Sequence, residues 1–265
     1  MDNFKPITKS TWTILLSMVI LMMSCTLDNS QKQSDSGQWS VDRAKKWKTE
    51  TGWMSGCNFL PSTAINQLEM WQEDSFDPQT INRELKWASQ LGFNAMRVYL
   101  HSYAWKQDPQ GFKDRIDEYL NISSTHGIST ILVFFDDCWN PVSNIGTQPS
   151  PKPGIHNSGW IQDPSVDLRS DTAKLYSWLE KYVKDIMHTF ANDSRVVVWD
   201  LYNEPGNSGH LNESLPLLKN TFNWAREVNP SQPLTVGVWN LELHELNKYQ
   251  LEESDIISYH QYQDK

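Results

Sequence analysis

The sequence has little positive charge and few cysteines, and each shortage excludes a class of protein. Lys and Arg number 23 against 32 Asp and Glu in 265 residues, so the formal net charge is −9. Nucleic-acid surfaces neutralise phosphates with clustered Lys and Arg, whereas acidic residues outnumber basic ones in this chain, so we expect no nucleic-acid partner. The sequence also lacks a glycine-rich loop after a predicted strand and any His/Cys grouping with metal-ligand spacing. We therefore expect no cofactor and no metal.

Three cysteines are too few for a disulfide scaffold. Cys57 and Cys138 fall on the first and third predicted strands, which are not neighbours. Although an exported protein can form disulfides, we expect two free, partly buried thiols. The chain also has no Gly-x-Ser-x-Gly sequence, which argues against a doubly wound hydrolase with a nucleophile elbow.

The one long apolar run lies near the N-terminus and predicts export. Lys5 and Lys9 precede the apolar residues 14–23, a run too short to favour a membrane span. The following Ser24-Cys25 resembles the lipobox of bacterial lipoproteins. We predict a signal peptide over residues 1–24, a lipid anchor on Cys25 and an exported lipoprotein in the periplasm or at the cell surface. Plain secretion or an uncleaved anchor is the alternative.

The rest of the chain divides into a polar segment and one domain. Residues 25–40 are polar without an apolar period and predict a flexible tether. The domain predicted over residues 41–265 alternates strands and helices. The predicted strands are residues 52–59, 94–100, 128–135, 195–202, 234–239 and 256–262. The predicted helices are residues 78–91, 113–125, 171–191, 215–228 and 243–249.

This alternation predicts an α/β fold with a parallel sheet. Residues 128–135 are almost continuously apolar, as in a parallel strand covered on both faces. Apolar residues in 171–191 recur with a period of 3.6, as in a helix that packs on one face. Six apolar strands and five helices fit both a doubly wound sheet and a (β/α)8 barrel, and periodicity does not separate the two.

Tryptophan is abundant, with 13 residues in 265. Flat aromatic faces stack on sugar rings, so this composition favours a carbohydrate ligand. Four tryptophans fall in loops after predicted strands, where either sugar stacking or packing fits: Trp71, Trp105, Trp139 and Trp160. Two others, Trp178 and Trp224, lie on predicted helices and are assigned to the core.

Polar residues stand where the predicted strands end. In a (β/α)8 barrel, catalytic groups project from the C-terminal ends of several strands. These ends carry Asn58, Arg97, Asp136, Asp137, Asn203-Glu204-Pro205, Trp239, His260 and Tyr262. A buried apolar strand that ends in Asn203-Glu204 is costly unless the carboxylate has a function. Because strand side chains alternate, both residues can face one site only if the strand bulges or ends there, and we predict that irregularity.

The order of these residues resembles the clan A retaining glycoside hydrolases, especially family five, the cellulase and mannanase group. The resemblance spans residues 50–262 and rests on Asn203-Glu204 at strand four, Arg97 at strand two and His260-x-Tyr262 at strand six. It implies a TIM (β/α)8 barrel of which about six βα units are present. It also implies hydrolysis of O-glycosidic bonds in a β-linked oligo- or polysaccharide, of β-glucan or β-mannan type, by a retaining double displacement.

The resemblance further implies a role for each residue. Glu204 would be the acid/base, with its pKa raised by burial and by a second carboxylate. Asn203 would bind the sugar 2-hydroxyl, and Arg97 would orient the nucleophile. Four more residues would line sugar subsites: His260, Tyr262, Trp139 and Trp105. Purely structural roles are the alternative for each, and Asp136 and Asp137 either shape a subsite or cap the following loop.

The sequence departs from the family at its end. The family nucleophile is a glutamate that closes strand seven, whereas Lys265 follows strand six by three residues. We therefore expect a C-terminally truncated barrel without the nucleophile, inactive as it stands and with an unpaired edge. The alternative function is a non-catalytic glycan-binding lipoprotein derived from such an enzyme. Intact Asn203 and Glu204 favour the enzyme.

Overall fold

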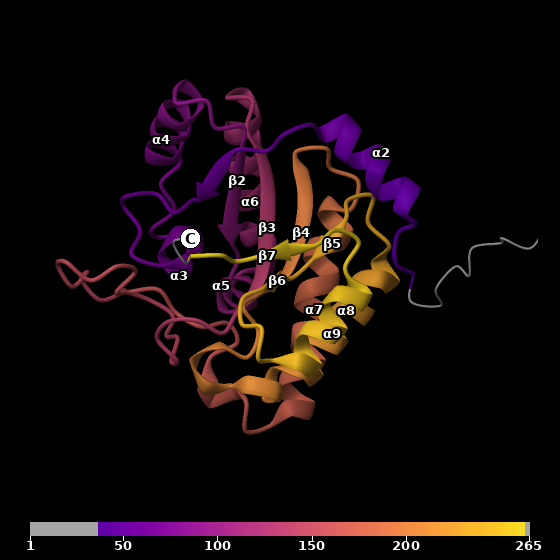
Figure 1. Cartoon of the computed structure of the whole chain (residues 1–265). Coiled ribbons are helices and arrows are strands. Elements are labelled where there is room, and N and C mark those ends of the chain that lie inside the picture. Colours follow the sequence, from indigo (N-terminus) through magenta and orange to yellow (C-terminus); the bar gives the residue numbers. More distant parts are fainter. Residues whose placement is uncertain (1–36, 263–265) are drawn as a thin grey trace, which may run out of the picture. The chain divides into compact units, whose positions relative to one another are not determined.

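The computed structural model describes residues 37–262, which belong to one compact unit (Figure 1). The predicted signal peptide, Cys25 and most of the predicted tether lie outside the described residues. Within 37–262, no helix has the length and apolarity needed to cross a bilayer.

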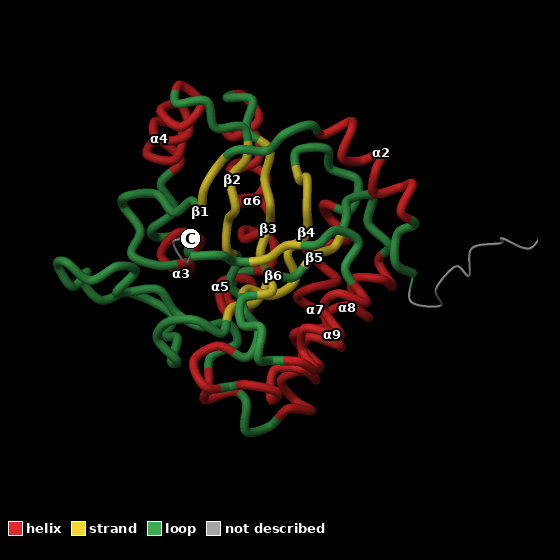
Figure 2. The backbone as a smooth tube through the Cα atoms, in the orientation of Figure 1, coloured by secondary structure: helices red, strands yellow, loops and turns green. Residues whose placement is uncertain are grey.

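A parallel sheet of five strands forms the centre of this unit (Figure 2). The strands pair in chain order, and every pair is parallel. They are β1 (Gly56–Asn58), β2 (Ala95–Tyr99), β3 (Ser129–Asp136), β4 (Val196–Asn203) and β5 (Leu234–Thr235). The parallel order confirms the predicted sheet, because each neighbouring pair is joined by a helical crossover.

The fifth predicted strand is broken in two. β5 pairs with β4, whereas β6 (Gly237–Val238) pairs in parallel with β7 (Ser258–Tyr259). The chain therefore changes its pairing partner at Val236. β5 and β6 together occupy the place of the fifth predicted strand, and β7 that of the sixth. Sequence reasoning missed this break, because residues 234–239 are apolar throughout.

Within residues 37–262, eight α-helices surround the strands. The five predicted helices are α4 (Pro78–Gln90), α6 (Pro109–Thr125), α7 (Thr172–Phe190), α8 (Leu215–Val228) and α9 (His244–Glu253). Three more were not predicted: α2 (Val41–Thr51), α3 (Gln67–Trp71) and α5 (Ser102–Gln107). Short 3₁₀ segments cover Val166–Leu168, Asn207–Gly209 and Leu211–Ser214.

Helix α6 begins four residues before its predicted start. The side chain of Asp108 accepts from the Gly111 N–H, and Pro109 occupies the first helical turn. The same Asp-Pro cap opens α4, where Asp77 accepts from the Thr80 N–H. A capping aspartate and a proline that needs no intrahelical partner both favour a helix start. The prediction recognised this signal before α4 and overlooked it before α6.

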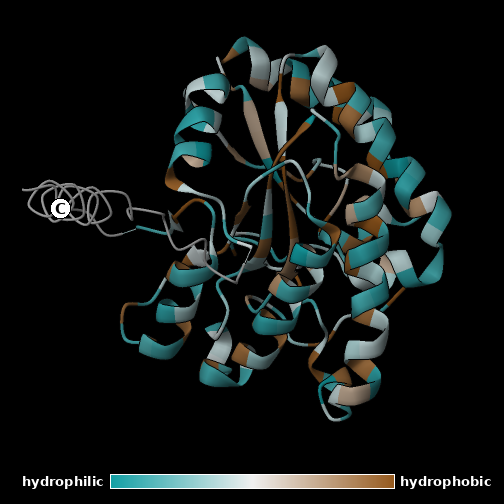
Figure 3. Ribbon diagram, turned by 90° about the vertical axis from the view of Figure 1, so that its right-hand side faces the viewer, coloured by the Kyte–Doolittle hydropathy of each residue, from teal (hydrophilic) through white to brown (hydrophobic). Residues whose placement is uncertain are grey.

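The core lies between the sheet and the helices. Figure 3 shows hydrophobic strands enclosed by helices whose outer faces are hydrophilic. Phe134 on β3 and Trp199 on β4 are fully buried, with their rings stacked at a centroid distance of 5.5 Å. Trp71 is also fully buried and donates its indole N–H to the Tyr99 carbonyl at 2.7 Å. Trp71 is therefore a core residue and not a sugar-stacking one.

The last residues of the predicted tether are fixed to the domain. The Trp39 N–H donates to Asp255 Oδ1 at 2.7 Å, and the Arg43 guanidinium lies 3.9 Å from the centre of the Trp39 ring. Asp255 also accepts from the Leu234 N–H at 2.8 Å. Trp39 is thus attached beside β5, and Ser40 caps α2.

Candidate active site

The backbone turns sharply where β4 ends. β4 stops at Asn203, and Glu204 has a φ of 47°, in the left-handed region that residues other than glycine rarely adopt. Gly206 follows with a φ of 86°, and a Cβ there would lie 2.8 Å from the Leu211 carbonyl oxygen, so the turn requires glycine. The strand therefore ends between Asn203 and Glu204, which confirms the predicted irregularity.

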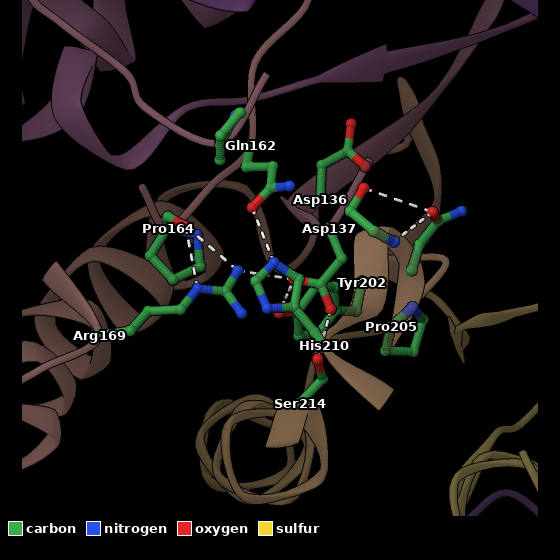
Figure 4. Close-up of polar contacts among 12 residues, drawn as sticks. Asp136, Asp137, Gln162, Pro164, Arg169, Tyr202, Pro205, His210 and Ser214 are labelled. Atoms are coloured by element: carbon green, nitrogen blue, oxygen red, sulfur yellow. Dashed lines mark hydrogen bonds and ion pairs between the residues drawn. The ribbon is translucent and has the colours of Figure 1, made fainter. Parts of the chain in front are cut away.

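Asp137 holds this turn in place (Figure 4). Its side chain is fully buried after the end of β3. One oxygen accepts from the Gly206 N–H at 2.8 Å and from the Ser214 hydroxyl. The other accepts from the Tyr202 hydroxyl at 2.7 Å and from Arg169 Nη2 at 2.6 Å. Asp137 thus stabilises the loop that carries Glu204. The sequence does not predict this role, because the residues that contact Asp137 lie far from it along the chain.

The Glu204 carboxylate has three hydrogen-bond partners from three segments. Oε1 lies 2.5 Å from Nδ1 of His260. Oε2 accepts from Asn207 Nδ2 at 2.6 Å and from the Cys138 thiol at 3.2 Å. Burial raises the pKa of Glu204, but the hydrogen bonds and the charge of His260 outweigh it, so that the net pKa lies below the usual value. This direction is opposite to the predicted one, because the three donors stabilise the ionised form.

The Asn203 amide is bound on both sides. Its Nδ2 donates to Asp136 Oδ1 at 2.7 Å. Its Oδ1 accepts from the Tyr99 hydroxyl at 3.0 Å and from Arg97 Nη2 at 2.9 Å. These bonds fix the orientation of the Asn203 amide, with Nδ2 toward Asp136 and Oδ1 toward Arg97 and Tyr99.

Arg97 forms a buried ion pair from the middle of β2 and not from its end, where the sequence placed it. Its Nε and Nη2 donate to Asp200 Oδ2 at 2.9 and 2.7 Å, and its Nη1 donates to Asn58 Oδ1 at 3.2 Å. The Asp200 side chain is 2% exposed and that of Arg97 is 15% exposed. Among the described residues, the carboxylate that Arg97 binds is therefore Asp200, which favours a structural role for this arginine.

His260 reaches Glu204 because of a glycine on the neighbouring strand. A Cβ at Gly237 would lie 2.5 Å from His260 Nε2, so a larger residue would displace the ring. The His260 N–H also donates to the Val238 carbonyl at 2.7 Å. Tyr262 packs edge-on against the His260 ring and is 82% exposed. The structure thus brings His260 to Glu204, with Tyr262 exposed beside it.

The candidate tryptophans separate clearly. Trp139 follows β3, is 36% exposed and packs edge-on against Trp160. Trp160 is buried and packs against Tyr99 at a centroid distance of 5.0 Å. Trp139 therefore has a solvent-accessible ring that packs against the buried ring of Trp160.

The contacts of Trp105 favour the structural alternative to the predicted role in substrate binding. Trp105 lies in α5, and its indole N–H donates to Asp185 of α7 at 2.8 Å. Its ring packs against Tyr182, also of α7. Sequence reasoning placed Trp105 in a loop because it did not detect the short helix α5, which directs this side chain to the helix layer.

Asp136 is the second buried carboxyl group beside Asn203. Its Oδ1 accepts from Asn203 and, at 2.9 Å, from the Cys138 N–H, whereas its Oδ2 has no partner among the described residues. Burial raises the pKa of Asp136 from 3.8 to about 8, against the opposing effect of these hydrogen bonds and of Arg97.

The raised pKa of Asp136 predicts a loss of stability with rising pH. Between 3.8 and about 8 the folded chain binds more protons than the unfolded chain, so the free energy of unfolding falls as pH rises through this range. Asp136→Asn keeps an oxygen that accepts from Asn203 and removes the charge. We expect the variant to be more stable than wild type at pH 8, by roughly 1–3 kcal/mol, and to lose this advantage at pH 4. Urea unfolding at pH 4, 6 and 8 measures the difference, and parallel pH curves for the two proteins would contradict it.

The structure places no metal cluster in its described part. Residues 37–262 contain no group of three or more His, Cys, Asp or Glu side chains arranged to hold a metal ion. Cys57 and Cys138 are both free, as predicted, but neither is partly buried: Cys57 lies on the exposed β1 and Cys138 is buried beside Glu204.

A family profile matches the whole of the described domain. The profile is that of Cellulase (glycosyl hydrolase family 5), and it covers residues 36–265. No curated protein matches the sequence.

Several solved structures are similar at low identity. β-Mannanase from the blue mussel Mytilus edulis is 19% identical, with 79% of this chain and 70% of that chain covered and a TM-score of 0.48. Endo-1,4-β-mannanase from Eisenia fetida is 13% identical, with coverage of 71% and 58% and a TM-score of 0.46. GH5_18 from Streptomyces cattleya in complex with GlcNAc is 13% identical, with coverage of 70% and 45% and a TM-score of 0.44. The chain therefore spans less than two thirds of the length of the last two proteins.

Proposed function

Because the chain belongs to glycosyl hydrolase family 5, a family of TIM (β/α)8 barrels, we propose that it is part of a retaining glycoside hydrolase. Its substrate is a β-linked oligo- or polysaccharide of β-glucan or β-mannan type. The single observation that carries the proposal is the Glu204 turn. A partly buried carboxylate follows directly after Asn203, at the C-terminal end of the fourth strand, in a strained conformation that Asp137 stabilises. Strained backbone of this kind is found where a side chain must be aimed at a site.

Glu204 supplies the general acid and base in this mechanism. The acid protonates the glycosidic oxygen as the bond to the anomeric carbon breaks, and the resulting carboxylate later deprotonates the attacking water. The described site holds Glu204 ionised, which is the state required for the second step. For the first step, a second carboxylate about 5–5.5 Å away and the exclusion of water by a bound sugar would raise the pKa of Glu204.

The remaining site residues bind and orient the sugar in this proposal. Asn203 exchanges one of its internal hydrogen bonds for the sugar 2-hydroxyl, and Arg97 orients the nucleophile. The exposed rings of Trp139 and Tyr262 contact the faces of the pyranose units. We assign no nucleophile among residues 37–262.

One observation favours a second candidate, a non-catalytic glycan-binding protein. Glu204 is paired with His260 and bound by two further donors, so within the described residues no proton is poised for transfer. A binding protein would use Trp139 and Tyr262 in the same way and would require no nucleophile.

The experiment is hydrolysis of β-glucan and β-mannan oligosaccharides by the natural protein. Proton NMR during the reaction identifies the anomer of each new reducing end. The proposal expects new reducing ends whose first-formed anomer is β, because two inversions retain the configuration. An α-anomer formed first would contradict the retaining mechanism. Retarded migration in glycan-containing gels without new reducing ends would support the binding protein instead.

We further propose that the protein is an exported lipoprotein, anchored through Cys25 in the periplasm or at the cell surface. The support is the sequence alone: Lys5 and Lys9, the apolar residues 14–23 and Ser24-Cys25. Labelling with radioactive palmitate in a bacterial host tests this proposal. Label that persists after Cys25→Ser would contradict it.

A further inference from the structure

The two oxygens of Glu204 have different surroundings. Oε2 accepts from two neutral donors in two different loops, Asn207 Nδ2 at 2.6 Å and the Cys138 thiol at 3.2 Å. Oε1 has a single partner, Nδ1 of His260 at 2.5 Å. The side chains of Glu204 and His260 are only 12% and 14% exposed, so bulk water has little access to either oxygen.

Building on the proposed function, we propose that Cys138 and Asn207 are positioning residues: their two donors occupy Oε2 of Glu204 and leave Oε1 as the oxygen that carries the catalytic proton. An oxygen that already accepts two hydrogen bonds is less basic than its neighbour, and a third hydrogen would meet the two donor hydrogens. The imidazole nitrogen of His260 can act as donor or acceptor, so Oε1 can exist with or without its own proton.

The thiol of Cys138 is fixed as a donor. Burial, followed by the charges of Asp136 and Glu204, raises the pKa of Cys138, so the sulfur keeps its hydrogen. Asn203 Nδ2 lies 3.4 Å from the sulfur and supplies a donor to it, which leaves the S–H for Glu204. The Cys138 N–H donates to Asp136 Oδ1 at 2.9 Å and fixes the loop itself.

The amide of Asn207 is also fixed in one orientation. Its Oδ1 accepts from the Ser208 N–H, so its Nδ2 must face Glu204. The Asn207 N–H donates to the Glu204 carbonyl at 3.0 Å, which closes the turn around the carboxylate. Both donors to Oε2 are therefore held by contacts that do not depend on a bound sugar.

The proton then follows a defined path. In the first step the O–H bond at Oε1 breaks, its electron pair stays on Oε1, and the proton passes to the departing glycosidic oxygen. That oxygen keeps the electron pair of its broken bond to the anomeric carbon, where the nucleophile carboxylate adds. In the second step a water molecule gives a proton back to Oε1 as its oxygen replaces the nucleophile.

The groups that can influence this titration come from two segments besides the loop of Glu204 itself. His260 and Tyr262 follow β7, and Cys138 follows β3. The next charged groups, Asp136 and Arg97, are both bound to Asn203. Any test must therefore separate the two donors from these neighbours.

Two measurements on the 265-residue chain test the proposal without requiring hydrolysis. The glutamates are labelled with ¹³C at the carboxyl group, and the Glu204 signal is identified by its loss in Glu204→Gln. NMR titration gives the pKa of Glu204. Isotope-edited infrared spectra at low pH give the C=O stretch of protonated Glu204, and they are recorded in a His260→Ala background, because the imidazolium that forms at low pH would donate to Oε1. If the proton lies on Oε1, then Oε2 is the carbonyl oxygen and its two donors lower the frequency of this stretch.

Cys138→Ala and Asn207→Ala are expected to raise the pKa of Glu204 and to move the C=O stretch to higher frequency. The shift should be larger for Asn207→Ala, because an amide N–H at 2.6 Å is a stronger donor than a thiol at 3.2 Å. Cys138→Ser keeps a donor and should leave the stretch at or below the wild-type frequency. Cys57→Ser, at the other free cysteine on exposed β1, is the matched control and should change neither value.

A C=O stretch that is unchanged in both alanine variants would place the proton on Oε2 and overturn the proposal, as would an unchanged pKa. NMR spectra of the backbone amides establish whether each variant is folded. If Cys138→Ala does not fold, Cys138→Ser still tests the role of the donor at this position. Absence of hydrolysis by the natural protein would overturn the proposed function while leaving these spectroscopic results unaffected.

Discussion

Glu204→Gln is expected to lower kcat on natural β-linked substrates by about 10²–10⁴-fold, the usual contribution of a general acid. Glutamine has nearly the same shape and can keep one bond to Asn207 or Cys138, but it has no proton to give to the leaving oxygen. KM should change little, because the side chain acts mainly in the transition state. Steady-state kinetics on oligosaccharides of the preferred sugar measure the effect in the natural protein.

Activated substrates provide the control for this prediction. An aryl glycoside whose phenol leaves without protonation should still form the glycosyl-enzyme in Glu204→Ala. Azide should then restore turnover by attacking the anomeric carbon, giving a β-glycosyl azide, because an anion needs no general base. Near-normal activity of Glu204→Gln on natural substrates would sink the acid/base assignment.

Arg97→Met is expected to reduce the free energy of unfolding by about 3–5 kcal/mol, the cost of leaving a buried charge without its partner. Asp200 accepts two N–H groups of Arg97 on Oδ2, and its Oδ1 has no partner within residues 37–262. Met fills a similar volume, so the loss reflects the charge more than a cavity. Urea unfolding at pH 7 provides the measurement.

The matched control removes both charges. The double variant Arg97→Met, Asp200→Asn should be more stable than Arg97→Met alone, because no ionised carboxylate is then left buried. Asn58 and Tyr99 also lose a donor in both variants, so this loss cancels in the comparison. If the single variant lost less than about 1 kcal/mol, as exposed ion pairs do, Asp200 would have to be hydrated.

The elements that the sequence predicts well have strong local signals. β3 and β4 are long apolar runs, and α8 occupies the predicted range Leu215–Val228. The break between β5 and β6 has no such signal, because both halves are apolar and the change of partner depends on strands that lie far apart in the chain. Helices α3 and α5 are short, with five and six residues, and offer no period to detect.

The same contrast applies to the site. The positions of Asn203 and Glu204 follow from the end of one strand, so the sequence locates them and even anticipates the irregular turn. The pKa direction of Glu204 depends on Cys138, Asn207 and His260, which come together only after folding. The sequence leaves two roles open for Asp137, because Arg169 and Ser214, which bind it, follow it by 32 and 77 residues.

The change of partner at Val236 has a consequence for hydrogen exchange. The β6–β7 ladder pairs only two residues, Gly237 with Ser258 and Val238 with Tyr259, whereas β2 and β3 pair over five. Short ladders open locally at a lower free energy than the whole domain unfolds. Since the His260 N–H is bonded to Val238, each such opening exposes this amide to solvent and releases the imidazole from Glu204. The exchange rate of this amide therefore reports how often Glu204 loses its contact with His260 while the rest of the sheet stays intact.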